Sequence, residues 1–222
     1  AHFLSHRFDR VITISRCIDD AYRKDDVPER QLRQIYDGVD VEEVRAAVRR
    51  SPTEVRSSLG LQPDQIVVVM VGHLRAWKGQ DVVISALAEL LARGRRQFHL
   101  LLVGGPTNSE DDRYIEQLKT MVHRAGLEPS VTFLGPRRDA VDFMNAADIV
   151  VHASTSPEPF GLVVVEALAL GKPVIASRLG GPAEVIQPGA GILFDPSQPG
   201  ELATLLDRLA GDPGERARLG GS

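Results

Sequence analysis

Continuous apolar runs of five to seven residues alternate with longer helical patterns from Gln65 onward. Strands that are apolar throughout, rather than at every second position, are typical of sheets covered on both faces. The runs predict strands at 66–72, 98–104, 131–135, 148–154, 173–177 and 191–195, and the intervening patterns predict helices at 79–93, 110–125, 139–147, 161–170 and 198–210. This alternation is the signature of βαβ units. It predicts an α/β fold, with a parallel sheet between two layers of helices.

The first part of the chain has a different pattern. It predicts a strand at 10–15, a helix at 16–24 and a strand running into a turn at 32–40. Residues 41–63 are charged and contain two prolines, which predicts a surface connection with one short helix and places the start of the main domain near Pro63. Ser109 is expected to cap the helix that follows it, and Gly126 and Gly171 fall where helices are expected to end.

Composition narrows the function classes. The chain has 222 residues, a net charge of −4 and one cysteine. The mixed charges do not indicate a nucleic-acid partner, and the lone Cys17 suits a reducing compartment such as the cytoplasm. There is no apolar run as long as a membrane span and no signal-peptide pattern. The first residues, which lack methionine and lead straight into a strand-like run, suggest a piece of a longer chain.

Ligands of open α/β sheets bind beyond the carboxyl ends of the strands. The first exit of the main domain is "GHLRAWKGQ", in which Gly72 allows close backbone approach while Arg75 and Lys78 match phosphate charge. The same residues are also compatible with a basic surface loop. The exits "GGPTN" and "GPRR" could pack against a flat ring or could simply form tight turns.

The stretch "SPEPFGLVVVEALALGKPVIAS" places Glu166 within a helix that is apolar on every side. Such a helix is buried, and a buried glutamate needs donors. No Lys or Arg lies three or four positions away, so a pair of ligand hydroxyls is one candidate partner. A distant arginine or water is the alternative.

Glu158 precedes this helix in "PEPFG". The helix amino terminus offers free N–H groups around Phe160, Gly161 and Leu162, which suit phosphate or sugar oxygens. Glu158 would accept from sugar hydroxyls there, or would merely cap the helix.

Other chemistry is not indicated. The six histidines show no metal-ligand spacing, and His99 and His152 fall inside strand patterns, which favours core positions. The acidic run "EDD" suits a helix amino terminus better than a metal site. Walker loops, nucleophile elbows and a strong GxGxxG pattern are missing from the sequence.

The motif "EPFGLVVVE" has the form E-x7-E and resembles the signature of retaining glycosyltransferases of family four, which have the GT-B architecture. "GHLRAWKG" resembles their phosphate loop, "VTFLG" the strand that ends near the base, and "GGPAEVI" the segment after the next strand. "RVITIS" and "YDGVD" resemble the junction of the two GT-B domains. The resemblance covers nearly the whole chain and implies a Rossmann-like, doubly wound sheet, the C-terminal half of a GT-B fold.

Three roles follow from this resemblance. Glu166 would bind the ribose hydroxyls of a nucleoside-diphosphate sugar, Glu158 would hold the donor sugar, and Lys78 would neutralise the departing diphosphate without a metal ion or other cofactor. Catalysis would rest on Glu158 and Lys78. The remaining donor-binding positions implied are Gly72, His73, Arg75, Gly135, Pro136, Phe160, Gly161 and Leu162.

The sequence departs from the family at His73, where arginine is usual, and at Asp37, where asparagine is common. We expect residues 1–40 to close the N-terminal domain, 41–63 to connect, and 64–222 to bind the sugar nucleotide. The implied whole enzyme transfers a hexose-type sugar to an acceptor hydroxyl with retention, in polysaccharide or glycoconjugate synthesis. This chain alone would be inactive, and its cytoplasmic enzyme could touch a membrane through the missing domain. Alternatives are a non-catalytic sugar-nucleotide module, or an epimerase or phosphorylase on the same fold.

Overall fold

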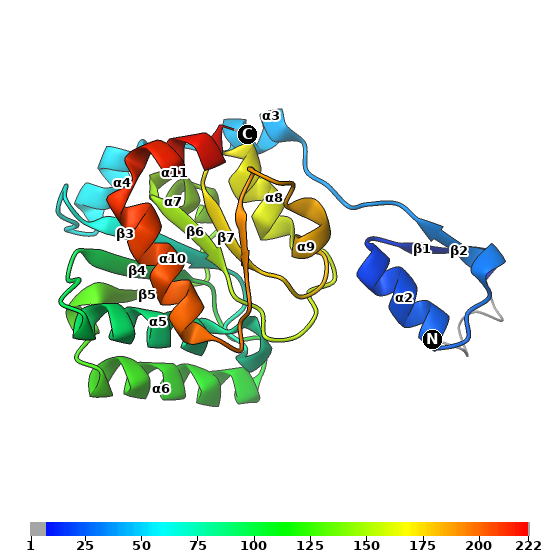
Figure 1. Ribbon diagram of the computed structural model, residues 1–222, viewed down its shortest axis with the longest axis horizontal. Helices are drawn as coiled ribbons and strands as arrows, with labels where there is room; N and C mark the ends of the chain where they lie inside the picture. The colour runs from blue at the N-terminus through cyan, green and yellow to red at the C-terminus, as the bar shows by residue number, and fades with distance from the viewer. Residues whose placement is uncertain (1–7, 222) are drawn as a thin grey trace.

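The computed structural model describes residues 8–221, and its centre is a six-stranded parallel sheet (Figure 1). The strand order is β5-β4-β3-β6-β7-β8. The strands are β3 (Ile66–Val71), β4 (Phe98–Val103), β5 (Val131–Gly135), β6 (Ile149–His152), β7 (Val174–Ser177) and β8 (Ile192–Phe194). The order runs in one direction from β3 to β5 and in the other from β6 to β8. The sheet therefore reverses between β3 and β6, and in doubly wound folds the crevice at that point holds the ligand.

Helices cover both faces of the sheet, as the continuous apolar strands predict. Val68 and Met70 of β3 pack into one core, and their neighbours Val67 and Val69 pack into the other. The first core includes side chains of α5 (Gln80–Ala92), α6 (Ser109–Arg124) and α10 (Pro199–Gly211). The second includes those of α4 (Pro52–Ser58), α7 (Ala140–Ala146) and α8 (Leu162–Ala169). The predicted α/β architecture is confirmed.

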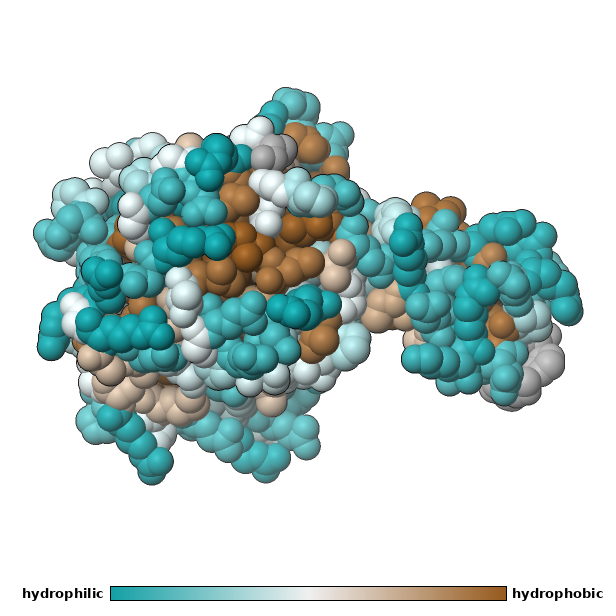
Figure 2. Space-filling model, in the orientation of Figure 1, coloured by the Kyte–Doolittle hydropathy of each residue, from teal (hydrophilic) through white to brown (hydrophobic). Residues whose placement is uncertain are grey.

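A small N-terminal unit, residues 8–34, lies beside this body (Figure 1). It consists of β1 (Val11–Thr13), α2 (Arg16–Lys24), a 3-10 turn (Glu29–Gln31) and β2 (Leu32–Gln34), with β1 and β2 parallel. Figure 2 shows the narrow waist between the two bodies. The carboxylate of Glu184 bridges this waist, because it accepts hydrogen bonds from the backbone N–H groups of Arg16 (2.8 Å) and Cys17 (2.9 Å) at the start of α2.

Residues 35–40 run in extended form from the unit to α3 (Val41–Ala46) and α4. Two capped helices therefore stand where the sequence predicted one. Asp40 accepts from the first amides of α3, and Ser51 and Glu54 form a capping box on α4. The predicted strand at 32–40 ends at Gln34.

All the strands and helices predicted for the main body are present, with ends within two residues of prediction. Three further 3-10 or α-helical turns were not predicted: Ala76–Lys78, Glu128–Ser130 and α9 (Pro182–Val185), and neither was α11 (Pro213–Gly220). Ser109 is not the cap of α6. Asn108 takes that place, since its Oδ1 accepts from the amides of Glu110 (2.9 Å) and Asp111 (3.0 Å).

Because His99 is buried, we expect the protein to lose stability as the pH falls. His99 lies in β4 with its Nε2 2.8 Å from Thr132 Oγ1, and burial lowers its pKa below 6.5. Well above pH 6.5 the ring is neutral in both the folded and the unfolded chain, so burial of His99 does not lower the free energy of unfolding. As the pH falls below this value the unfolded chain binds the proton first, and stability is lost by at most about 1.4 kcal/mol per pH unit.

Urea denaturation at pH 7, 6 and 5 would measure this effect. His99→Gln keeps a polar group near Thr132 but does not titrate, so its stability should fall less steeply over this range. His123→Gln is a second histidine variant for comparison: the His123 side chain is 81% exposed, and its Nδ1 lies 2.6 Å from Glu128 Oε1, so this variant also removes a surface contact. Equal slopes for wild type and His99→Gln would contradict the prediction.

Candidate functional site

A cavity of about 400 Å³, the switch-point cavity, opens where the strand order reverses. Its walls come from 71–73 at the end of β3, from Lys78, from His152 at the end of β6, and from 158–163 at the start of α8. Ile14 of the N-terminal unit and Asp37 of the extended segment complete it. The cavity thus lies where a doubly wound sheet binds its ligand.

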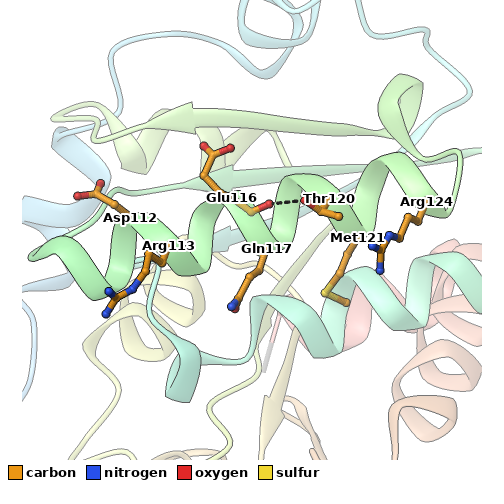
Figure 3. Close-up of a pocket in the computed structure, with 7 residues that line it drawn as sticks. All are labelled: Asp112, Arg113, Glu116, Gln117, Thr120, Met121 and Arg124. Carbon is orange, nitrogen blue, oxygen red and sulfur yellow. Dashed lines mark hydrogen bonds between the residues drawn. The ribbon is translucent and has the colours of Figure 1, made fainter.

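Two neighbouring cavities share residues or elements with it. A side cavity of about 250 Å³ also contains Gly72 and His73, with Gly104, Gly105 and Pro136 opposite them. Glu166 lines a third cavity of about 390 Å³, which the connection 38–47 and Val141 enclose. A wider hollow of about 700 Å³ runs along one face of α6, from Asp112 to Arg124 (Figure 3). It is lined by that helix alone, so the strand ends contribute nothing to it.

The loop after β3 makes close backbone contacts at two glycines, where any side chain would force the backbone to shift. A Cβ at Gly104 would lie 1.8 Å from the carbonyl oxygen of Gly72, and one at Gly79 would lie 2.0 Å from that of Ala153. Between them, Gln80 donates from Nε2 to the carbonyl oxygen of His73 at 3.0 Å. The first approach brings the β3 and β4 exits together, and the second brings the β3 and β6 exits together, next to Lys78 at the cavity wall.

Three donors converge on one oxygen of Glu158. Its Oε2 lies 2.6 Å from Lys78 Nζ, 2.9 Å from Ser154 Oγ and 3.1 Å from His152 Nε2. Burial alone would raise the pKa of Glu158, but the hydrogen bonds from His152 and Lys78, with the Lys78 charge, lower this pKa to about 2. Glu158 is therefore an ionised carboxylate at neutral pH although it is only 8% exposed.

The backbone around Glu158 is fixed by the segment after β7. Glu158 N–H donates to Leu179 O (3.2 Å), and Gly181 N–H donates to Glu158 O (2.8 Å). A Cβ at Gly180 would lie 2.2 Å from the Glu158 carbonyl oxygen, so this contact requires glycine. The amino terminus of α8 has Gly161 as its cap and no side-chain cap. Glu158 consequently does not cap that helix, which was the alternative reading of this residue.

Glu166 has a different environment. It lies one turn into α8, and within residues 8–221 its carboxylate makes no hydrogen bond or ion pair. Burial raises its pKa above the usual 4.5. A half-buried carboxylate without donors, facing a cavity, has its accepting capacity free for a ligand.

Among the other predicted site residues, Pro136 lines the side cavity, and Phe160, Gly161 and Leu162 line the switch-point cavity. Gly135 lines neither; its carbonyl accepts from the Gly104 amide at 2.9 Å. Arg75 also lies outside the three cavities, and its Nε is 3.3 Å from Asp111 Oδ1 of α6. In this structure Arg75 therefore neutralises a helix carboxylate instead of facing the cavity.

The cavity and its cluster also contain residues that were not predicted as site residues: Ile14, Asp37, Val71, His152, Ser154, Pro159 and Val163. His152 is buried in a strand, as predicted, but its ring contacts Glu158. It stands at the carboxyl end of β6, and a search of every residue at strand exits would have found it and Ser154. Ile14 carries no such signal, because only the packing of the N-terminal unit brings it to the cavity; Asp37 falls in the motif "YDGVD", but its place at the cavity was not predicted.

Within the described part of the chain, no group of His, Cys, Asp and Glu side chains is arranged to hold a metal ion. In the same residues, no helix has the length and hydropathy needed to cross a membrane.

Comparison with known proteins identifies the relatives of this chain. Residues 52–221 match the family model for glycosyl transferases group 1. A D-inositol 3-phosphate glycosyltransferase of Rhodococcus jostii is 39% identical over 171 residues, which are 74% of this chain and 37% of that protein. The second such enzyme of Catenulispora acidiphila is 37% identical over 198 residues, 86% of this chain and 45% of that protein. The chain thus spans less than half the length of these curated relatives.

Among solved structures, Anabaena HepE in complex with UDP-glucose aligns with a TM-score of 0.87 and 35% identity. The alignment covers 96% of this chain and 57% of that chain. The fold is thus the one seen in a protein whose crystal structure contains a nucleotide sugar.

Proposed function

Because this chain belongs to the glycosyl transferases group 1 family, we propose that it is the donor-binding part of a retaining, metal-independent glycosyltransferase of the GT-B architecture. Residues 1–40 would close the acceptor-side domain, 41–63 would connect the domains, and 64–222 would bind the donor. The donor would be a uridine-diphosphate hexose, since the related HepE was crystallised with UDP-glucose. The sugar would pass to a hydroxyl of the acceptor.

The observation that carries this proposal is the charge arrangement of the switch-point cavity. Lys78 and the uncapped amino terminus of α8 lie on two of its walls, and Glu158 lies between them. A diphosphate in the cavity would meet a cation and free backbone amides, which stabilise the charge that develops on it as the sugar leaves. Glu158 would accept from sugar hydroxyls, and Glu166 from the ribose diol.

Isothermal titration of the purified chain with UDP and UDP-glucose tests the donor site. We expect both to bind, and Lys78→Ala to weaken both by roughly tenfold, since a hydrogen bond to a charged group is worth about 1.5–3 kcal/mol. Lys119→Ala is the matched control, because Lys119 lies on α6 with its side chain 53% exposed. Failure of UDP, ADP and GDP alike to bind would refute the proposal.

The chain alone is expected to transfer no sugar. The acceptor side of the cleft would come from the rest of the enzyme, and positioning of the two substrates supplies much of the rate. A coupled assay for UDP release from UDP-glucose, with a panel of sugar and polyol acceptors, would measure this. Sustained, acceptor-dependent UDP release by the 222-residue chain would contradict the expectation.

A further inference from the structure

We propose that His152 and Ser154 are positioning residues that orient Glu158 toward the donor sugar, an inference that rests on the proposed function. The two oxygens of the Glu158 carboxylate differ in their contacts. Lys78, His152 and Ser154 all contact Oε2, while within residues 8–221 Oε1 makes no hydrogen bond. Glu158 lines the switch-point cavity, so Oε1 is the oxygen left for a ligand.

The distances assign the protons in this cluster. His152 Nε2 lies 3.1 Å from both Glu158 Oε2 and Ser154 Oγ. If Nε2 were bare, it would face the carboxylate oxygen as a second acceptor, which is repulsive. Nε2 therefore carries the proton and donates to both oxygens, and the Ser154 hydroxyl donates its own proton to Oε2 at 2.9 Å.

The burial of His152 and Ser154 supports a role in holding Glu158. Ser154 is fully buried and His152 is 4% exposed, and the buried His152 Nδ1 has no hydrogen-bond partner in the described residues. An unpaired buried ring nitrogen is destabilising. If position 152 had only a structural role in this central strand, an apolar residue would be more stable there. Histidine is needed only if its Nε2 must donate a hydrogen bond.

The pair also removes a conflict in the site. Lys78 is the closest partner of Glu158, yet the proposed function requires the same ammonium group to serve the diphosphate. When Lys78 turns to a phosphate, Oε2 keeps two donors that cannot leave, because both are buried. Glu158 then stays ionised and oriented with Oε1 toward the sugar hydroxyls. The two residues would thus act on the sugar through Glu158, and we expect little effect on the nucleotide part of the donor.

A double-mutant cycle with two ligands tests this inference. His152→Leu and Ser154→Ala should each weaken UDP-glucose binding by about tenfold and UDP binding far less. His152→Gln, whose amide can donate from a similar position, should restore most of the lost affinity. In a Glu158→Ala background, His152→Leu should have no further effect on UDP-glucose, because a positioning residue acts only through the group it positions.

Thermal unfolding of each variant shows whether it is folded, and Ser154→Ala, the smaller change, serves if His152→Leu does not fold. Equal losses on UDP and UDP-glucose, or a His152→Leu loss that persists without Glu158, would overturn the inference. So would unchanged UDP-glucose binding in both single variants. Wild-type protein that binds neither ligand would instead refute the proposed function, which separates the two failures.

Discussion

Glu166→Ala is expected to weaken UDP and UDP-glucose binding by similar factors of roughly tenfold or more. If Glu166 accepts hydrogen bonds from the ribose hydroxyls, both ligands lose the same contacts, each worth about 1.5–3 kcal/mol. Glu158→Ala should leave UDP binding nearly intact and weaken only UDP-glucose. Titrations of the two variants with the two ligands give four affinities, and their pattern separates a ribose contact from a sugar contact.

Glu110→Ala is the matched control for these measurements, because Glu110 lies at the start of α6 with its side chain 82% exposed. The raised pKa of Glu166 adds a second signature. As the pH falls, its carboxylate is protonated sooner than an ordinary glutamate, so UDP binding should weaken at a pH above 4.5 in the wild type but not in Glu166→Gln. Identical losses for both alanine variants on both ligands would show that the motif supports the fold instead.

Gly79→Ala is expected to lower the free energy of unfolding by about 3 kcal/mol or more. Gly79 has φ of 78°, and a Cβ there would lie 2.0 Å from the Ala153 carbonyl oxygen. The substitution therefore combines left-handed backbone strain of about 1–2 kcal/mol with a clash that must displace a backbone atom. Because Gly79 follows Lys78, and Ala153 precedes Ser154, this displacement should also weaken UDP binding.

Gly126→Ala is the control that isolates the clash. Gly126 has φ of 64°, but nothing lies within 4 Å of a Cβ at this position. Its loss should be limited to about 1–2 kcal/mol of backbone strain. Urea denaturation of the two variants measures the difference in their free energies of unfolding. Equal losses would mean that the backbones at Gly79 and Ala153 can move apart at little cost.

The strands of the main body could be predicted because each is a continuous apolar run, and the helices because their patterns end at Gly, Pro or charged residues. The capping residues of helices were harder to predict. Asn108 and Ser109 are both good capping residues, and only the backbone conformation selects Asn108. The short α9 has too few residues to show a period.

The site was predictable only in part. The positions of Lys78 and Glu158 beyond strand ends follow from the fold, but their 2.6 Å contact joins residues 80 positions apart. Local patterns carry no information about such a pair. His152 illustrates the same limit, because its place in an apolar strand predicts burial and says nothing about the direction of its ring. Arg75 matches phosphate charge by residue type, and its pairing with Asp111 depends on how α6 packs.

The two hydrogen bonds from the first amides of α2 to Glu184 join the N-terminal unit to the main body. Their energy indicates how strongly the two bodies are held together. Glu184 lies in α9, and this helix directly follows Gly180 and Gly181, which pack against the backbone of Glu158 and Phe160. Two hydrogen bonds to a carboxylate contribute about 1.5–3 kcal/mol each, less than the roughly 8 kcal/mol of a micromolar ligand. Ile14 belongs to the N-terminal unit, Asp37 lies in the segment that joins this unit to the main body, and both line the switch-point cavity. A ligand that contacts Ile14 would therefore link occupancy of the cavity to the position of the N-terminal unit, and each would change the other by the same free energy.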